Sequence, residues 1–118
     1  MPVPSALDEA LAESLSASHK VGEMAARCLR GSTAFLVGDL DAAEAELQQS
    51  VVLARAIPTP GEELVPAWML ARLAIERGQL EAAGKLAEEA ARAAAVADPE
   101  KYSAAVDAMR ARIAAASG

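Results

Sequence analysis

The 118-residue chain is poor in aromatic residues and in cysteine. It has one tryptophan, one tyrosine and one phenylalanine, which together make up 3% of the residues. Strands favour aromatic and β-branched residues, so this shortage argues against a β-sandwich, a β-barrel or a dinucleotide-binding α/β fold. The single cysteine cannot form an internal disulfide. A disulfide-stabilised scaffold is therefore excluded, and a reducing compartment fits.

Basic residues and long apolar runs are also scarce. The chain has 11 basic and 17 acidic residues, a formal charge of −6 and a pI near 4.7, which argues against a dedicated nucleic-acid surface. The most apolar stretch, residues 90–97, is short and contains Arg92, so we expect no membrane span. Residues 1–4 lack the basic and apolar regions of a signal peptide, and we expect a cytoplasmic location.

Alanine is abundant instead, with 31 of the 118 residues. Because alanine is the best helix former, we expect an all-α fold. The length of the chain indicates a single domain, residues 1–118. Capping and helix-breaking residues divide the chain into six helical segments: 4–17, 19–37, one between Asp39 and Pro58, 64–77, 80–97 and 99–116. The pattern is weak at residues 16–18, so one long helix in place of the first two segments is the alternative.

Glycine and aspartate mark the helix ends. Gly38 and Gly78 are expected to end helices, because glycine tolerates the positive φ that satisfies the last carbonyl groups. Asp39 or Asp41, and Asp98 before a proline, are expected to cap the helices that follow. The expected buried faces are Ala43, Leu47, Val51 and Ala54; Met69, Leu70, Leu73 and Ala74; Ala83, Leu86, Ala87, Ala90 and Ala94; and Tyr102, Val106, Met109 and Ile113.

Similar residues recur along the chain with a period of 40. Small residues match in two triplets: Gly38, Gly78 and Gly118, and Ala34, Ala74 and Ala114. A period of 20–50 residues is typical of solenoids built from equivalent supersecondary units. The period therefore indicates a stack of helix hairpins.

Residues 38–43 (GDLDAA) and 78–83 (GQLEAA) resemble the inter-helix turn of the tetratricopeptide repeat (TPR). This resemblance implies a right-handed α-solenoid of about six helices in antiparallel hairpins. The chain departs from the family in its period of 40 instead of 34, and in Arg30 and Arg110, which occupy positions where a core leucine is expected. The longer period is similar to the helical-repeat regions of large bacterial ATP-binding transcriptional activators.

The resemblance also implies a binding face, because the first helix of each TPR pair lines a concave groove. It places the following residues toward that groove: Arg27, Cys28, Ser32, Phe35, Val65, Trp68, Arg72 and Ile75. In this interpretation Trp68 and Phe35 supply apolar contact, while Arg72 and Arg27 orient acidic groups. The alternative is structural: Trp68 is core and Arg72 pairs with Glu76. The asparagine–lysine clamp that some family members use for a terminal carboxylate is not found at these positions.

No catalytic constellation is visible in the sequence. His19 is expected to be a solvated histidine, and Cys28 a buried, inert thiol on an apolar stripe. We therefore expect a non-catalytic protein-interaction module without metal or cofactor, which binds a peptide or helix of a partner. The alternative is a regulatory or self-association segment of a larger signalling protein. An unfinished repeat at Gly118 would leave a stacking face exposed for that purpose.

Overall fold

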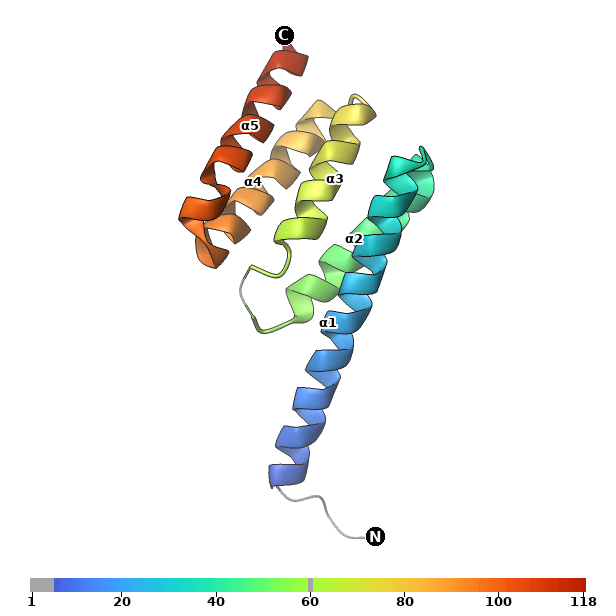
Figure 1. Cartoon of the computed structure of the whole chain (residues 1–118), viewed down its shortest axis with the longest axis vertical. Coiled ribbons are helices and arrows are strands. Elements are labelled where there is room, and N and C mark those ends of the chain that lie inside the picture. Colours follow the sequence, from blue (N-terminus) through green and yellow to red (C-terminus); the bar gives the residue numbers. More distant parts are fainter. Residues whose placement is uncertain (1–5, 60) are drawn as a thin grey trace.

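The computed structural model describes residues 6–59 and 61–118, and every regular element in these ranges is a helix (Figure 1). The helices are α1 (Ala6–Leu36), α2 (Leu40–Ala56), α3 (Leu64–Glu76), α4 (Leu80–Ala97) and α5 (Pro99–Ser117). The expected all-α fold is confirmed. Within the described ranges, no helix combines the length and the apolar character needed to cross a membrane.

The expected number of six helices is wrong, because the first two segments form one helix. α1 runs without a break through residues 16–18. Serine costs about 0.5 kcal/mol in a helix interior relative to alanine, far less than glycine or proline, so two serines do not end a helix. The alternative of one long helix is thus correct. The expected start of the first segment, Pro4, lies outside the described residues.

The ends of α1 and α3 are built in the same way. The N–H groups of Asp39 and Gln79 each donate to the carbonyl five residues back, at 2.9 Å in both turns. Between them, Gly38 and Gly78 have φ angles of 85° and 71°. This is the Schellman motif, in which a residue with positive φ ends the helix and its last carbonyl groups are satisfied. The predicted role of these two glycines is confirmed.

Two of the expected caps are confirmed. The side chain of Asp39 accepts a hydrogen bond from the Ala42 N–H at 3.2 Å, at the start of α2. The side chain of Asp98 accepts one from the Lys101 N–H at 3.1 Å, and Pro99 is the first residue of α5. A carboxylate in this position satisfies a backbone donor that has no partner inside the helix.

The helices form two layers. In Figure 1, α1, α3 and α5 run in the same direction in front, and α2 and α4 run in the opposite direction behind them. α1 packs on α2, α2 on α3, α3 on α4, and α4 on α5. α1 also contacts α3 directly, and side chains of α3 pack against α5. The first layer therefore presents one face built from α1, α3 and α5, which we call the odd-helix face.

Burial follows the 40-residue spacing in the two hairpins α1–α2 and α3–α4. Six pairs of residues 40 apart are buried in both hairpins: Met24 and Leu64, Gly31 and Ala71, Ala43 and Ala83, Leu47 and Ala87, Ser50 and Ala90, and Ala54 and Ala94. The spacing does not extend to the exposed Ala114 of α5. In α2 to α5, all residues of the expected buried faces are buried except Met69, Leu86, Tyr102 and Ile113, which are partly buried.

Candidate partner-binding face

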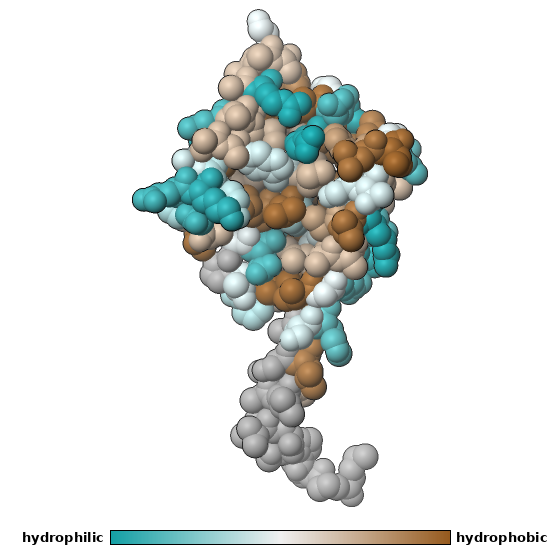
Figure 2. All heavy atoms as spheres, viewed as in Figure 1, coloured by the Kyte–Doolittle hydropathy of each residue, from teal (hydrophilic) through white to brown (hydrophobic). Residues whose placement is uncertain are grey.

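The odd-helix face carries side chains from three parallel helices in matching positions. Residues 40 apart in the sequence line two hollows on this face in three sets: Ala25, Val65 and Ala105; Cys28, Trp68 and Ala108; and Ser32, Arg72 and Arg112. Figure 2 shows the same side of the molecule, with several brown apolar patches across its middle, interrupted by teal hydrophilic side chains. The face therefore combines apolar surface with cationic groups.

The first hollow, which we call the α3–α5 hollow, contains the only tryptophan of the chain. It has a volume of about 310 Å³ and lies between Trp68 and Arg72 on α3 and Ala108, Met109 and Arg112 on α5. Trp68 is half-buried and packs against the cores on both of its sides. Its ring is thus held in place by packing while part of it remains accessible from the hollow.

Arg72 connects this hollow to α1. Its guanidinium carbon lies 5.4 Å from the centroid of the Phe35 ring, which is a cation–π distance. In the part of the chain that the structure describes, neither Arg72 nor Arg112 pairs with a carboxylate. The expected alternative of an Arg72–Glu76 pair is therefore not found there. The two guanidinium groups keep their hydrogen-bond donors available at the edge of the hollow.

Five other arginines do pair with carboxylates of a neighbouring helix. Arg27 and Arg30 contact Glu46 of α2, and Arg55 binds Glu89 of α4. The other two pairs are Arg77 with Asp41 and Arg110 with Glu88. The hydrogen bond from Arg110 lowers the pKa of Glu88, which keeps this carboxylate ionised in more acidic solution.

The residues expected at the groove thus separate into two groups. Phe35, Trp68 and Arg72 come together on the odd-helix face, and Ile75 packs beside Trp68 against Met109. Arg27 lies apart from them, with its guanidinium turned toward α2. The sequence reasoning missed Arg112 as a site residue. Its offset of 40 residues from Arg72 is the signal that identifies it.

A second hollow, the α1–α3 hollow, is larger. It has a volume of about 530 Å³ and is lined by Met24, Leu29, Val65 and Tyr102, among others. Cys28 forms part of its wall and is half-buried. Burial raises the pKa of the Cys28 thiol, so the reactive thiolate is scarce at neutral pH. His19, by contrast, is exposed, as expected.

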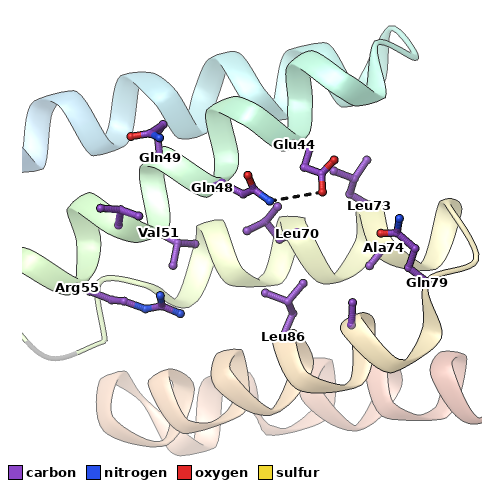
Figure 3. Close-up of a pocket in the computed structure, with 12 residues that line it drawn as sticks. Glu44, Gln48, Gln49, Val51, Arg55, Leu70, Leu73, Ala74, Gln79 and Leu86 are labelled. Atoms are coloured by element: carbon purple, nitrogen blue, oxygen red, sulfur yellow. Dashed lines mark hydrogen bonds between the residues drawn. The ribbon is translucent and has the colours of Figure 1, made fainter.

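A third hollow lies on the opposite side of α3, between α2 and α4 (Figure 3). Leu70 and Leu86 point into it, and Gln48 donates a hydrogen bond to Glu44 at its wall, at 3.4 Å. Its cation, Arg55, is already bound to Glu89 at 3.0 Å. A ligand there would have to compete with this ion pair, so the odd-helix face is the better candidate for binding.

Among the described residues, no group of three or more histidine, cysteine, aspartate or glutamate side chains is placed to hold a metal ion. No protein-family model matches the chain, and no curated protein or solved structure is similar enough to count as a match.

Proposed function

We propose that this protein is a non-catalytic interaction module that binds an acidic, partly apolar peptide or helix of a partner protein on the odd-helix face. The observation that carries the proposal is the α3–α5 hollow, which Trp68 lines together with Arg72 and Arg112, two arginines that bind no carboxylate in the described part of the chain. The partner's apolar side chain enters the hollow, and its carboxylates bind the arginines.

The chemistry of these side chains supports the proposal. Tryptophan and arginine are enriched among the residues that contribute most to protein–protein affinity. A guanidinium group binds a carboxylate through two parallel hydrogen bonds, which gives geometric specificity. The chain as a whole has a formal charge of −6 and repels acidic ligands. An acidic segment is therefore attracted at the two arginines and disfavoured elsewhere on the surface.

The repeated hairpin supports a TPR-like, right-handed α-solenoid as the architecture of this module. The Schellman turns at Gly38 and Gly78 are 40 residues apart, and so are the buried positions of the two hairpins. Stacked hairpins of this kind present extended surfaces for protein partners. A cytoplasmic location goes with this proposal, since a single cysteine suits a reducing compartment. The 40-residue period resembles that of the helical-repeat regions of large bacterial transcriptional activators. This resemblance supports a role as a segment of a signalling protein.

The test uses a displayed library of random 16-residue peptides, selected on the purified protein. We expect the selected peptides to combine acidic with aromatic or aliphatic residues. Arg112→Gln and Arg72→Gln should each weaken the binding of a selected peptide about 10-fold or more, because each removes charge-assisted hydrogen bonds. Calorimetric titration measures the affinity.

Arg92→Gln on α4 is the matched control, because it removes the same charge from the other layer of the molecule. Its peptide affinity should stay unchanged, and Arg112→Gln should retain the melting temperature. The proposal fails if neutral peptides are selected, or if the three variants lose affinity equally. It also fails if the loss of binding accompanies an equal loss of stability, since the arginines would then be structural.

A further inference from the structure

The two hollows of the odd-helix face carry opposite charges. Among the described residues that line the α1–α3 hollow, Glu62 is the only charged one, and it is partly buried. The charged residues that line the α3–α5 hollow are the two arginines, Arg72 and Arg112. Like these arginines, Glu62 forms no ion pair within the described ranges. Each hollow therefore offers a ligand unpaired charge of one sign.

Both hollows adjoin α3, and exposed apolar side chains connect them. Val65 lines the α1–α3 hollow, and Trp68, about one helical turn further along α3, lines the α3–α5 hollow. Val65 is 57% exposed, and Leu29 of α1, which lines the same hollow, is 69% exposed. The seven residues from Val65 to Arg72 span about 10 Å along the helix. Two turns of a partner helix or about three residues of an extended peptide cover this distance, so one segment can contact both hollows.

The charges of α3 and α5 change along the face in the same direction. Residues 61–68 have two acidic residues and no basic residue, and residues 69–77 have two arginines and one glutamate. Residues 98–107 have three acidic residues and one lysine, and residues 108–117 have two arginines and no acidic residue. α3 and α5 run in the same direction (Figure 1), so the face has an acidic end and a basic end. Complementary charge fixes the register of a bound partner, and this face can therefore select one orientation.

The lysine at the acidic end does not neutralise the carboxylate of the α1–α3 hollow. Lys101 lies over the ring of Tyr102, with its Nζ atom 5.2 Å from the ring centroid, and no ion pair joins it to Glu62 in the described part of the chain. A ligand that is acidic along its whole length would place a carboxylate beside Glu62. Like charges repel, so the acidic residues of the ligand belong at the other end of the face.

We infer that the partner segment has one basic and one acidic end and lies along α3 in a single orientation. Its basic residue binds Glu62, its acidic residues bind Arg72 and Arg112, and one apolar side chain enters each hollow. This orientation rests on the proposed function, to which it adds the α1–α3 hollow, the basic residue and the direction of the bound segment.

The affinity of selected peptides tests the basic contact. We expect peptides selected from the random library to carry a lysine or arginine on the side of their apolar residues that is opposite to the acidic residues. Glu62→Gln should weaken the binding of such a peptide about 5-fold, the upper range for a partly exposed ion pair. Glu63→Gln is the matched control, because this neighbouring carboxylate lines neither hollow, and it should change the affinity less than about 2-fold. Replacement of the peptide's basic residue by glutamine should abolish the effect of Glu62→Gln.

Disulfide capture tests the orientation. Cys28 lines the α1–α3 hollow, and the exposed Ala108, in the equivalent position of α5, lines the α3–α5 hollow. Two versions of a selected peptide carry one cysteine each, activated as a mixed disulfide with thionitrobenzoate, in place of the apolar residue next to the basic or the acidic end. The protein thiolate displaces thionitrobenzoate, whose release gives the rate. The native protein should capture the first peptide about 10-fold faster than the second, and a Cys28→Ser, Ala108→Cys variant should show the reverse preference. Each comparison uses one thiol, so the low reactivity of Cys28 cancels.

The failure of this orientation is distinguishable from the failure of the proposed function. Equal capture rates for the two peptides, or the opposite preference, overturn the orientation. Selected peptides without a basic residue overturn it as well, as do equal effects of Glu62→Gln and Glu63→Gln. The proposed function stands in these cases as long as Arg72→Gln and Arg112→Gln still weaken binding. Loss of the two arginine effects overturns both.

Discussion

The α1–α2 and α3–α4 hairpins share one backbone plan and fill it differently. Both turn through a Schellman motif, and both bury the same six positions, each 40 residues apart in the sequence. In the first hairpin, Gly31 of α1 faces Leu47 of α2. In the second, the equivalent positions are Ala71 and Ala87, and Met109 of α5 joins them in the core. Both hairpins thus fill the space between their helices, as close packing requires. The first hairpin fills it with a glycine opposite a leucine, and the second with two alanines and a methionine from α5.

The prediction with the largest effect concerns Leu47, whose equivalent in the second hairpin is the smaller Ala87. Leu47 is fully buried, and Leu47→Ala should lower the free energy of unfolding by about 2–5 kcal/mol, measured by urea denaturation. Gly31→Ala should also destabilise, by about 1–3 kcal/mol, because the added Cβ would lie 2.6 Å from Leu47 Cγ. In the first hairpin, glycine is required at position 31 by the leucine opposite it.

The double variant gives the first hairpin the alanine pair of the second. In the Leu47→Ala background the clash with Leu47 is absent, and the nearest remaining atom is the Ala43 carbonyl oxygen at 3.3 Å. Gly31→Ala should then stabilise by up to about 1 kcal/mol through helix propensity. The two substitutions should therefore be strongly non-additive. Additive effects would show that positions 31 and 47 do not compensate each other, and the comparison of the two hairpins would fail.

The helix caps of the two hairpins also differ. Asp39 caps α2 with its side chain, and Gln79, in the equivalent place before α4, makes no such hydrogen bond. Asp39→Ala should cost about 1 kcal/mol of stability, while Gln79→Ala should cost much less. Thermal unfolding followed by circular dichroism measures both.

Gln79→Asp is the complementary change. It should raise stability by about 0.5–1 kcal/mol, since it introduces the cap of the first hairpin into the second. If Asp39→Ala and Gln79→Ala have the same effect, the hydrogen bond from Ala42 contributes nothing measurable.

The smallest expected effect concerns acid sensitivity. Glu88 of α4 binds Arg110 of α5, and the equivalent residue of the first hairpin is the uncharged Gln48. The hydrogen bond from Arg110 lowers the pKa of Glu88 in the folded protein. A lowered pKa contributes stability above the ordinary carboxyl pKa, and the contribution is lost as the pH falls through the folded pKa. Glu88→Gln should therefore lower stability at pH 7 and have little effect at pH 3.

Denaturation at the two pH values checks this prediction. Arg110→Gln removes the partner of the same pair and should reduce the pH dependence in the same way. A Glu88→Gln effect of equal size at pH 7 and pH 3 would show that the ionised form makes no specific contribution.

Helix ends and buried faces were predictable because their causes are local. Gly38 and Asp39 act on backbone groups within five residues of themselves, and the apolar spacing of α2 places Leu47 and Val51 on one side. The predicted break near residue 17 failed because a weakened apolar pattern was taken as a helix end. In that part of α1, no α2 residue lies alongside to require an apolar face.

The candidate site was predictable only in part. Helical spacing places Trp68 and Arg72 together on α3, and the family resemblance placed Phe35 on the same face. The partners of Arg27 and Arg110 lie 19 and 22 residues away in the sequence, on other helices. Such pairs depend on how the helices are set against each other, which no local pattern contains.

The sequence by itself determined the helical class, the turns at Gly38 and Gly78, and the 40-residue spacing, because alanine content, backbone conformation and apolar periodicity act over one or two helical turns. Only the tertiary structure decided which arginines are bound by carboxylates and which remain available beside Trp68. It also decided that one side of α1 has no partner helix. These properties depend on distances between helices, and such distances are set by packing over the whole chain.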